Sequence, residues 1–334
     1  MNSNTINLYK QFEKEWSDNW IKNILDNIDE NLDFEALSYN PNVTWEMVKS
    51  YPNINWSFKY LSLNPNITWG IVKDNLDEDW DFRNLSKNPN ITWEIVKNNP
   101  NFKWDYDYLL DNPNMTFEIT IQNPQINWEY YWISENPNLT WEIVKNNPHL
   151  NWDYEYLSCN PIITWEIVEN NPHLDWGYGY LSSNSNITLD IMKDNKDRPW
   201  DYQIFLSRNK NASWEILDSF MKKNINCIHL SFNENITWEI ISSNLDKEWA
   251  SSGVSKNPNI SWDIVNKNPN FKWSFYYLCH NTMDISKNKF IRNKYREHFK
   301  SCGIKEELIE LLFHPNNLSL SRKLGVDVPS FKYK

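Results

Sequence analysis

Histidine and cysteine are the residues of this chain best suited to bind a metal or to act as a base or a nucleophile. His298 and Cys302 stand four residues apart, a spacing that puts both side chains on one face of a helix. A zinc site needs two more ligands. The other candidate ligands lie near this pair only if a particular fold is assumed, and they are Cys279, His280 and His314. His149 and His173 share one place in two similar segments and are interpreted as turn residues. We therefore expect no metal site and no cofactor.

Acidic residues recur at one fixed place, two positions after a Thr or Ser. The column comprises Glu46, Glu94, Glu118, Glu142, Glu166, Asp190, Glu215, Glu239 and Asp263. One interpretation is a row of carboxylates that binds a basic peptide. The other, which we favour, is placement near helix N-termini, often with Lys three residues on, as at Glu94 and Lys97. A repeated column gives no carboxylate a unique environment for acid–base catalysis, so we expect no catalytic residue and no enzyme.

These residues belong to a phrase that returns every 24 residues, for example NPNITWEIVKNNPNFKWDYDYLLD at residues 88–111. Its Thr or Ser stands at positions 44, 68, 92, 116, 140, 164, 188, 213, 237 and 261, with one step of 25. Twelve residues after this Thr or Ser stands a Trp in every repeat but one, and in that repeat the residue is Ile225. Such a period is typical of a repeat array.

Each repeat predicts two short helices. Thr92 is placed as an N-cap and Asn99-Pro100 as a stop, while the second helix, resting on Trp104, Tyr106 and Leu109, is short enough to be partly 3₁₀. Alternation of aromatics allows a strand there, but the leucine and the recurrent prolines count against it. We predict an all-α solenoid of 24-residue two-helix repeats. Asn side chains should form Asx turns, and we attribute the excess of Asn to compositional bias as much as to a physical requirement.

The phrase LSxNPNITWEIVK with its 24-residue period resembles the uncharacterised Asn-Pro-Asn tandem-repeat proteins of giant DNA viruses, over roughly residues 31–280. More distantly it is similar to the leucine-rich repeat variant, in which an α-helix alternates with a 3₁₀-helix. That resemblance implies a right-handed superhelix. Trp and Tyr stand here where the variant prefers Leu and Val, and its cysteine-rich cluster is missing from this chain. Neither resemblance implies an activity.

Three regions follow from the pattern: residues 1–40 as a lead and a degenerate first repeat, residues 41–286 as the solenoid, and residues 287–334 as a helical, basic C-terminal cap. With helices spaced 8 to 10 Å apart, the array should form a rod or arc on the order of 100 Å long. In the cap, six apolar residues are available to cover the last repeat: Phe290, Ile291, Tyr295, Phe299, Leu308 and Leu311.

Charge and hydropathy restrict the partners. The formal net charge is −11, although residues 287–334 hold 11 Lys and Arg against 5 Asp and Glu. An acidic array repels phosphates, so nucleic acid is expected only at residues 287–334. The twenty Trp residues coincide with core columns, which favours packing over stacking on bases or sugars. No long apolar run occurs and the four cysteines show no paired spacing, so we expect no membrane partner and a cytoplasmic location.

The remaining signal is a local departure from the repeat. In residues 112–135, Ile121 stands where most repeats carry Lys, and Tyr131 stands where charged or polar residues are usual, next to Trp132. Exposed aromatic and apolar residues of this kind concentrate binding energy at interfaces. We therefore predict a non-catalytic scaffold that binds a protein partner, with Ile121, Tyr131 and Trp132 as candidate contacts. The alternatives are a self-assembling structural component and nucleic-acid binding through the basic segment.

Overall fold

The computed structural model describes residues 3–28, 31–221 and 227–303, and every regular element in this part of the chain is helical. The predicted all-α fold is thus confirmed. The chain divides into two compact units. Unit 1 comprises residues 1–31, 258–271 and 282–334, and unit 2 comprises residues 32–257 and 272–281. The repeats and their internal contacts lie mainly in unit 2.

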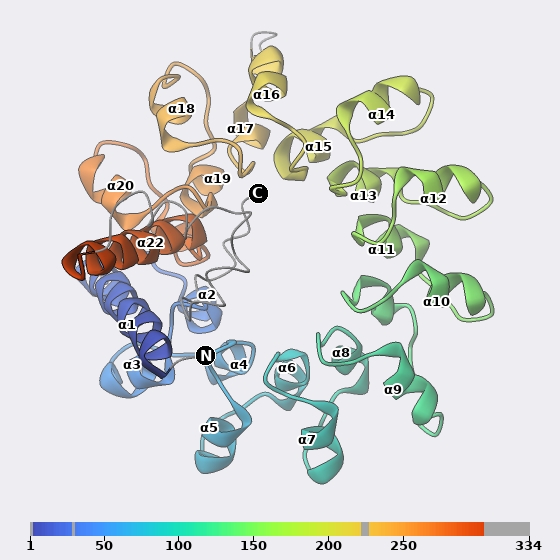
Figure 1. Ribbon diagram of the computed structural model, residues 1–334, viewed down its shortest axis with the longest axis horizontal. Coiled ribbons are helices and arrows are strands. Elements are labelled where there is room, and N and C mark those ends of the chain that lie inside the picture. The colour runs from blue at the N-terminus through green and yellow to red at the C-terminus, as the bar shows by residue number, and fades with distance from the viewer. Residues whose placement is uncertain (1–2, 29–30, 222–226, 304–334) are drawn as a thin grey trace. The chain divides into compact units, whose positions relative to one another are not determined.

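Unit 2 is a repeat solenoid in which two kinds of short helix form two tiers, visible in Figure 1. The inner tier consists of α2 (Phe34–Tyr39), α4 (Phe58–Leu61), α6 (Phe82–Lys87), α8 (Tyr106–Leu110), η1 (Trp132–Glu135), α11 (Tyr154–Cys159), α13 (Tyr178–Ser183), α15 (Tyr202–Arg208), α17 (Cys227–Leu230), α19 (Ser251–Lys256) and α21 (Phe275–Leu278). The outer tier consists of α3 (Trp45–Ser50), α5 (Trp69–Asp74), α7 (Trp93–Asn98), α9 (Phe117–Gln122), α10 (Trp141–Asn146), α12 (Trp165–Asn170), α14 (Leu189–Asp194), α16 (Trp214–Met221) and α18 (Trp238–Ser242).

Capping residues explain where the outer helices begin. The hydroxyl of Thr92 accepts the N–H of Ile95 at the start of α7, and the same bond recurs in most repeats. Several inner helices begin at an aspartate cap instead, as where the Asp105 carboxylate accepts the N–H groups of Asp107 and Tyr108. The inner elements are mostly α-helical, and η1 is the 3₁₀ element among the described residues.

The core of unit 2 lies between the tiers. Val96 and Leu109 are almost completely buried, and Trp104 is 8% exposed. The indole N–H of Trp104 donates to the carbonyl of Asn99 (2.9 Å), which satisfies the one polar group of the ring. Its ring lies 5.7 Å from that of Trp69 in the preceding repeat. The predicted packing role of the second Trp column is therefore confirmed.

A buried ladder of asparagines joins each repeat to the one before it. The side-chain nitrogen of Asn88 donates to the carbonyls of Ser62 and Asn64 (both 2.9 Å), while its oxygen accepts the N–H of Asn90 (2.8 Å). Asn90 in turn donates to Pro65 of the preceding repeat. The expected Asx turns are present, and the bonds across the repeat boundary add a second physical requirement for Asn. These side chains supply hydrogen-bond donors to buried backbone carbonyls of the preceding repeat, such as that of Ser62.

The ladder also joins the first and the last inner helix of unit 2. Asn40, after α2, donates to the carbonyls of Cys279 (2.9 Å) and Asn281 (3.1 Å), which are 239 and 241 residues away. This is the register of every internal rung. Of the expected rod or arc, the rod is therefore wrong for unit 2, because a rod keeps its first and last repeats apart. The inner tier closes on itself.

Unit 1 contains α1 (Ser3–Asp26), α20 (Trp262–Lys267) and α22 (Asp284–Ser301). The long helices α1 and α22 pack together through the Phe12–Tyr295 ring pair (5.2 Å between centroids) and the Lys287–Glu13 ion pair (2.8 Å). Within the predicted lead and degenerate first repeat, residues 3–26 form the single helix α1. Among the predicted capping residues, Ile291, Tyr295 and Phe299 are buried in unit 1; Leu308 and Leu311 lie outside the described residues.

Candidate partner-binding face

Five aromatic side chains of consecutive inner-tier elements form the strongest candidate site. We call them the aromatic face, and they are Tyr108, Tyr131, Trp132, Tyr156 and Tyr180. Tyr131, Tyr156 and Tyr180 are 37, 39 and 41% exposed, unusually open for large apolar rings. Ring centroids lie 4.9 Å apart for Tyr131 and Trp132, 6.1 Å for Tyr108 and Trp132, and 5.8 Å for Tyr156 and Tyr180. The rings are thus neighbours along the tier.

Rigid elements hold these rings in place. Within α11, Tyr156 directly precedes the buried Leu157, and because successive helical side chains point about 100° apart, the helix turns the ring away from the core. The same arrangement recurs at Tyr180 and Leu181 of α13. Each of these helices is tied to its neighbour by the asparagine ladder, as by Asn184, which donates to Ser158 (2.9 Å). The face is therefore preorganised by the repeat.

One substitution explains the irregular element in the middle of the face. In most repeats a buried serine accepts the first N–H of the next inner segment, as Ser86 does from Asp105 (3.0 Å). Leu110 occupies this serine column and is fully buried. A leucine side chain offers no acceptor to the N–H of Glu129, and the segment that follows is the 3₁₀-helix η1. Tyr131 becomes the residue just before that helix.

The electrostatic environment of the face is negative. Burial, followed by the nearby carboxylates of Asp105 and Glu129, raises the pKa of Asp107, and Arg83 opposes this effect. Partial desolvation and then Asp107 and Glu129 likewise raise the pKa of Tyr131. The carboxylates that raise these two pKa values carry negative charge, and negative charge attracts a cation. The face is therefore suited to a positively charged group.

The structure separates the three predicted contact residues. Tyr131 and Trp132 lie together in the inner tier, while Ile121, which is 53% exposed, belongs to α9 of the outer tier. The sequence reasoning also missed Tyr156 and Tyr180. Their signal was present, because Tyr60, Tyr108, Tyr156 and Tyr180 share one repeat position, but it was absorbed into the aromatic core pattern.

His280 lies at the closure of the inner tier, next to a carboxylate and a hydroxyl. Catalytic histidines often have such neighbours, but here the contacts are structural. His280 Nε2 lies 2.8 Å from the Asp33 carboxylate, and Nδ1 lies 3.3 Å from the Tyr39 hydroxyl. A general base needs one ring nitrogen directed at the reacting proton. Both nitrogens of His280 are used within the protein, and the rings of Tyr276 and Tyr277 lie within 6 Å. The residue fastens α21 to α2.

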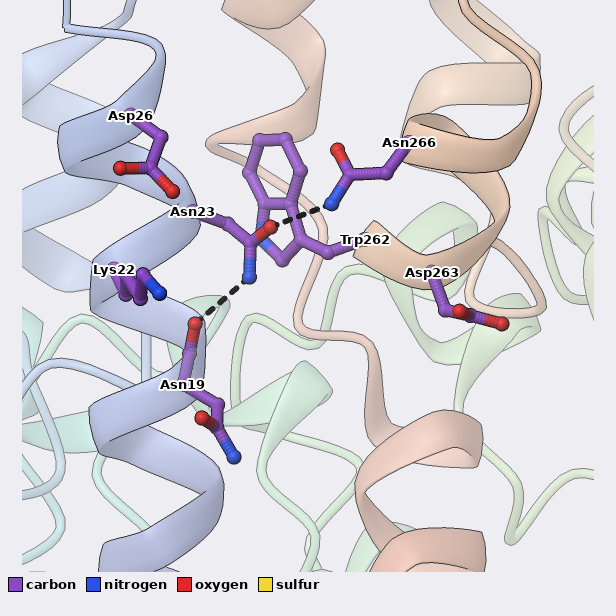
Figure 2. A pocket seen from close by; sticks show the side chains of 7 residues that line it. All are labelled: Asn19, Lys22, Asn23, Asp26, Trp262, Asp263 and Asn266. Carbon is purple, nitrogen blue, oxygen red and sulfur yellow. Dashed lines mark hydrogen bonds between the residues drawn. The ribbon is translucent and has the colours of Figure 1, made fainter.

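Unit 1 contains a polar hollow of about 490 Å³ between α1 and α20, shown in Figure 2. Its amide groups already bind one another: Asn266 donates to Asn23 (2.8 Å), which donates to the Asn19 carbonyl (2.8 Å). Trp262 forms its wall and is only 5% exposed. The amide groups of Asn23 and Asn266 in the hollow are therefore already used within the protein.

The remaining sequence candidates have ordinary surroundings. Cys302 Sγ lies 3.8 Å from His298 Nε2, as the spacing indicates, but the described residues contain no group of three or more possible metal ligands. The acidic column lies in the first turns of outer helices, where Glu94 pairs with Lys97 (2.7 Å). In the basic α22, Lys294 is paired with Glu15 of α1 (2.5 Å), which reduces the charge available to nucleic acid. No described helix is long and apolar enough to cross a membrane.

Comparison with protein-family models, with curated proteins and with solved structures found no match. The resemblance to viral tandem repeats thus stays a prediction, as does the handedness of the superhelix.

Proposed function

We propose that this chain is a non-catalytic scaffold that binds a partner protein through the aromatic face of unit 2. The observation that carries the proposal is the set of three open tyrosines, 37 to 41% exposed, aligned beside two further aromatic rings. Tyrosine and tryptophan are enriched where interface energy concentrates. A tyrosine also loses little rotamer freedom on binding because it has only two side-chain torsions.

The arrangement of the unit supports binding rather than chemistry. Adjacent repeats are cross-linked by buried hydrogen bonds, so a partner meets a surface that needs little reordering, which reduces the entropic cost of association. The carboxylates near the face recur from repeat to repeat. The four cysteines are free, which favours a reducing compartment such as the cytoplasm.

Panning a random-peptide library against the full chain tests this function. Wild-type protein should enrich peptides that the double variant Tyr156→Ser, Tyr180→Ser does not retain. The matched control is Tyr106→Ser with Tyr202→Ser, because these two tyrosines are equally exposed (38% each) but lie outside the aromatic face. Enrichment that survives in both variants, or no enrichment by the wild type, contradicts the proposal.

The competing functions give different results in solution. A self-assembling component would show mass that rises with protein concentration, measured by sedimentation. A nucleic-acid binder would retain labelled RNA or DNA in a salt-dependent way that is lost on truncation at residue 286. The scaffold predicts neither behaviour for the wild-type chain.

A further inference from the structure

One pair of neighbouring repeats shows how the chain itself places cations on an aromatic ring. The Arg83 guanidinium and the Lys87 ammonium each lie 4.2 Å from the centre of the Tyr108 ring. Arg83 also pairs with Asp105 (3.2 Å) and Lys87 with Asp111 (2.5 Å). An aromatic ring with carboxylates beside it thus forms a socket, and both chemical components attract a cation.

The tyrosine of this socket recurs further along the tier without the chain's own cations and with other carboxylates near it. Tyr156 and Tyr180 occupy the repeat position of Tyr108. Asp153 occupies the position of Asp105 before Tyr156, whereas Gly177 stands there before Tyr180, and Cys159 and Ser183 stand in the positions of Asp111. The carboxylates that act on Tyr180 are Glu155 and Asp153. The positions of Arg83 and Lys87 are taken by Tyr131 and Glu135 before Tyr156, and by Glu155 and Cys159 before Tyr180. In the part of the chain that the structure describes, no lysine or arginine lies over either ring.

Carboxylates that surround the two rings act on one another. The pKa of Glu135 is raised by partial desolvation and then by Asp111, against the opposite effect of Lys87. The pKa of Tyr180 is raised first by Tyr156, then by partial desolvation and by Glu155. Negative charge is therefore concentrated where the repeat elsewhere holds Arg83 and Lys87. A cation of a partner would occupy the repeat positions of Arg83 and Lys87. It would make the contacts with a tyrosine ring that these two residues make with Tyr108.

We propose that the sockets at Tyr156 and Tyr180 bind an extended, lysine- or arginine-bearing segment of a partner protein. The proposal rests on the scaffold function and specifies its partner. Charge complementarity selects the occupant: the carboxylates beside the rings repel nucleic-acid phosphates but pair with basic side chains. Neighbouring helices of a tier lie about 8 to 10 Å apart, and an extended chain advances about 3.3 Å per residue. Cationic side chains about every third residue therefore fit successive sockets.

A defined peptide tests the inference on the full chain. The probe is a fluorescent twelve-residue peptide with Lys at every third position and Gly or Ser between, and binding is measured by anisotropy. The control peptide carries Glu in place of each Lys. We expect the Lys peptide alone to bind, and to bind more weakly as salt is raised. Equal binding of the Glu peptide overturns the inference.

Variants of the protein then locate the binding. Glu135→Lys supplies the socket with a cation in the place of Lys87 and should weaken binding of the Lys peptide about tenfold. The matched variant Glu142→Lys makes the same charge change on α10 of the outer tier, where the side chain is exposed, and should leave affinity unchanged within about twofold. Should Glu135→Lys fold poorly, Glu155→Gln carries the test, because Glu155 is exposed and the change is isosteric.

The outcomes separate this inference from the scaffold function. Loss of binding in Glu135→Lys or Glu155→Gln but not in Glu142→Lys supports the sockets. Undiminished binding in the socket variants overturns them. If the Lys peptide is not bound while peptides of other composition are retained only when Tyr156 and Tyr180 are present, the scaffold stands and the basic partner is rejected. If no peptide is bound, both proposals fail.

Discussion

Each buried asparagine of the ladder uses nearly all of its hydrogen-bonding capacity. Asn88 is completely buried, donates twice across the repeat boundary and accepts once within its own turn. Aspartate lacks the two donors, and an apolar residue would remove a donor from the carbonyls of both Ser62 and Asn64. The backbone carbonyls of the preceding repeat therefore require Asn at this position. The sequence of a single repeat does not show this requirement.

Cys279 takes the serine place of the column at the closure, and burial raises the pKa of its thiol to about 11 from 9.0. A raised pKa means that the folded protein holds this proton more tightly than the unfolded chain. The contribution to stability is complete below about pH 9 and is lost as pH rises toward 11. We expect wild type to lose about 2 kcal/mol of unfolding free energy between pH 7.5 and 10.5, relative to Cys279→Ser.

Urea denaturation of both proteins at the two pH values measures this difference. Serine is the residue that other repeats place there, for example Ser62, so the variant should fold normally. Tyrosines titrate equally in both proteins and cancel. If the difference in unfolding free energy between wild type and Cys279→Ser is the same at both pH values, the thiol is not buried in solution.

Short elements of this fold were predictable wherever their signals are local. Thr92 as a cap and Trp104 as core follow from chemistry within twelve residues, and the structure confirms both. Tyr156 was not recognised as a site residue because its exposure depends on which side of α11 faces the core. The closure at Asn40 was also beyond reach, because the turn between successive repeats is small and accumulates over the whole array.

Deleting one complete repeat tests whether the 24-residue period is the unit of packing. Removing residues 88–111 keeps inner helix beside inner helix and should leave a protein that unfolds cooperatively, although with a weakened closure. Removing residues 88–99 alone should place unlike segments side by side and abolish cooperative unfolding. Near-ultraviolet circular dichroism during denaturation follows the buried tryptophans in both variants. Equal damage from the two deletions would contradict the repeat packing.

At the scale of the molecule, the closure makes unit 2 differ from an open repeat array. In an open array the first and last repeats each leave one face without a neighbour, and dedicated caps must cover it. In unit 2 the first and last inner helices cover each other through Asn40 and through the His280–Asp33 pair. The aromatic face is thus part of a continuous tier, and its geometry depends on contacts that span nearly the whole sequence.

The most direct test of this account compares Asn40→Ala with Asn88→Ala in chemical denaturation. Both side chains are buried, and each donates to two carbonyls in the same register, Asn40 across the closure and Asn88 between adjacent repeats. Each lost hydrogen bond should cost about 1 kcal/mol, and a buried acceptor carbonyl that loses its donor adds a further cost. Each substitution should therefore cost about 2 to 4 kcal/mol. A closed tier predicts equal losses, within about 1 kcal/mol. If Asn88→Ala shows the full loss while Asn40→Ala costs less than about 1 kcal/mol, the tier is open in solution and the account is contradicted.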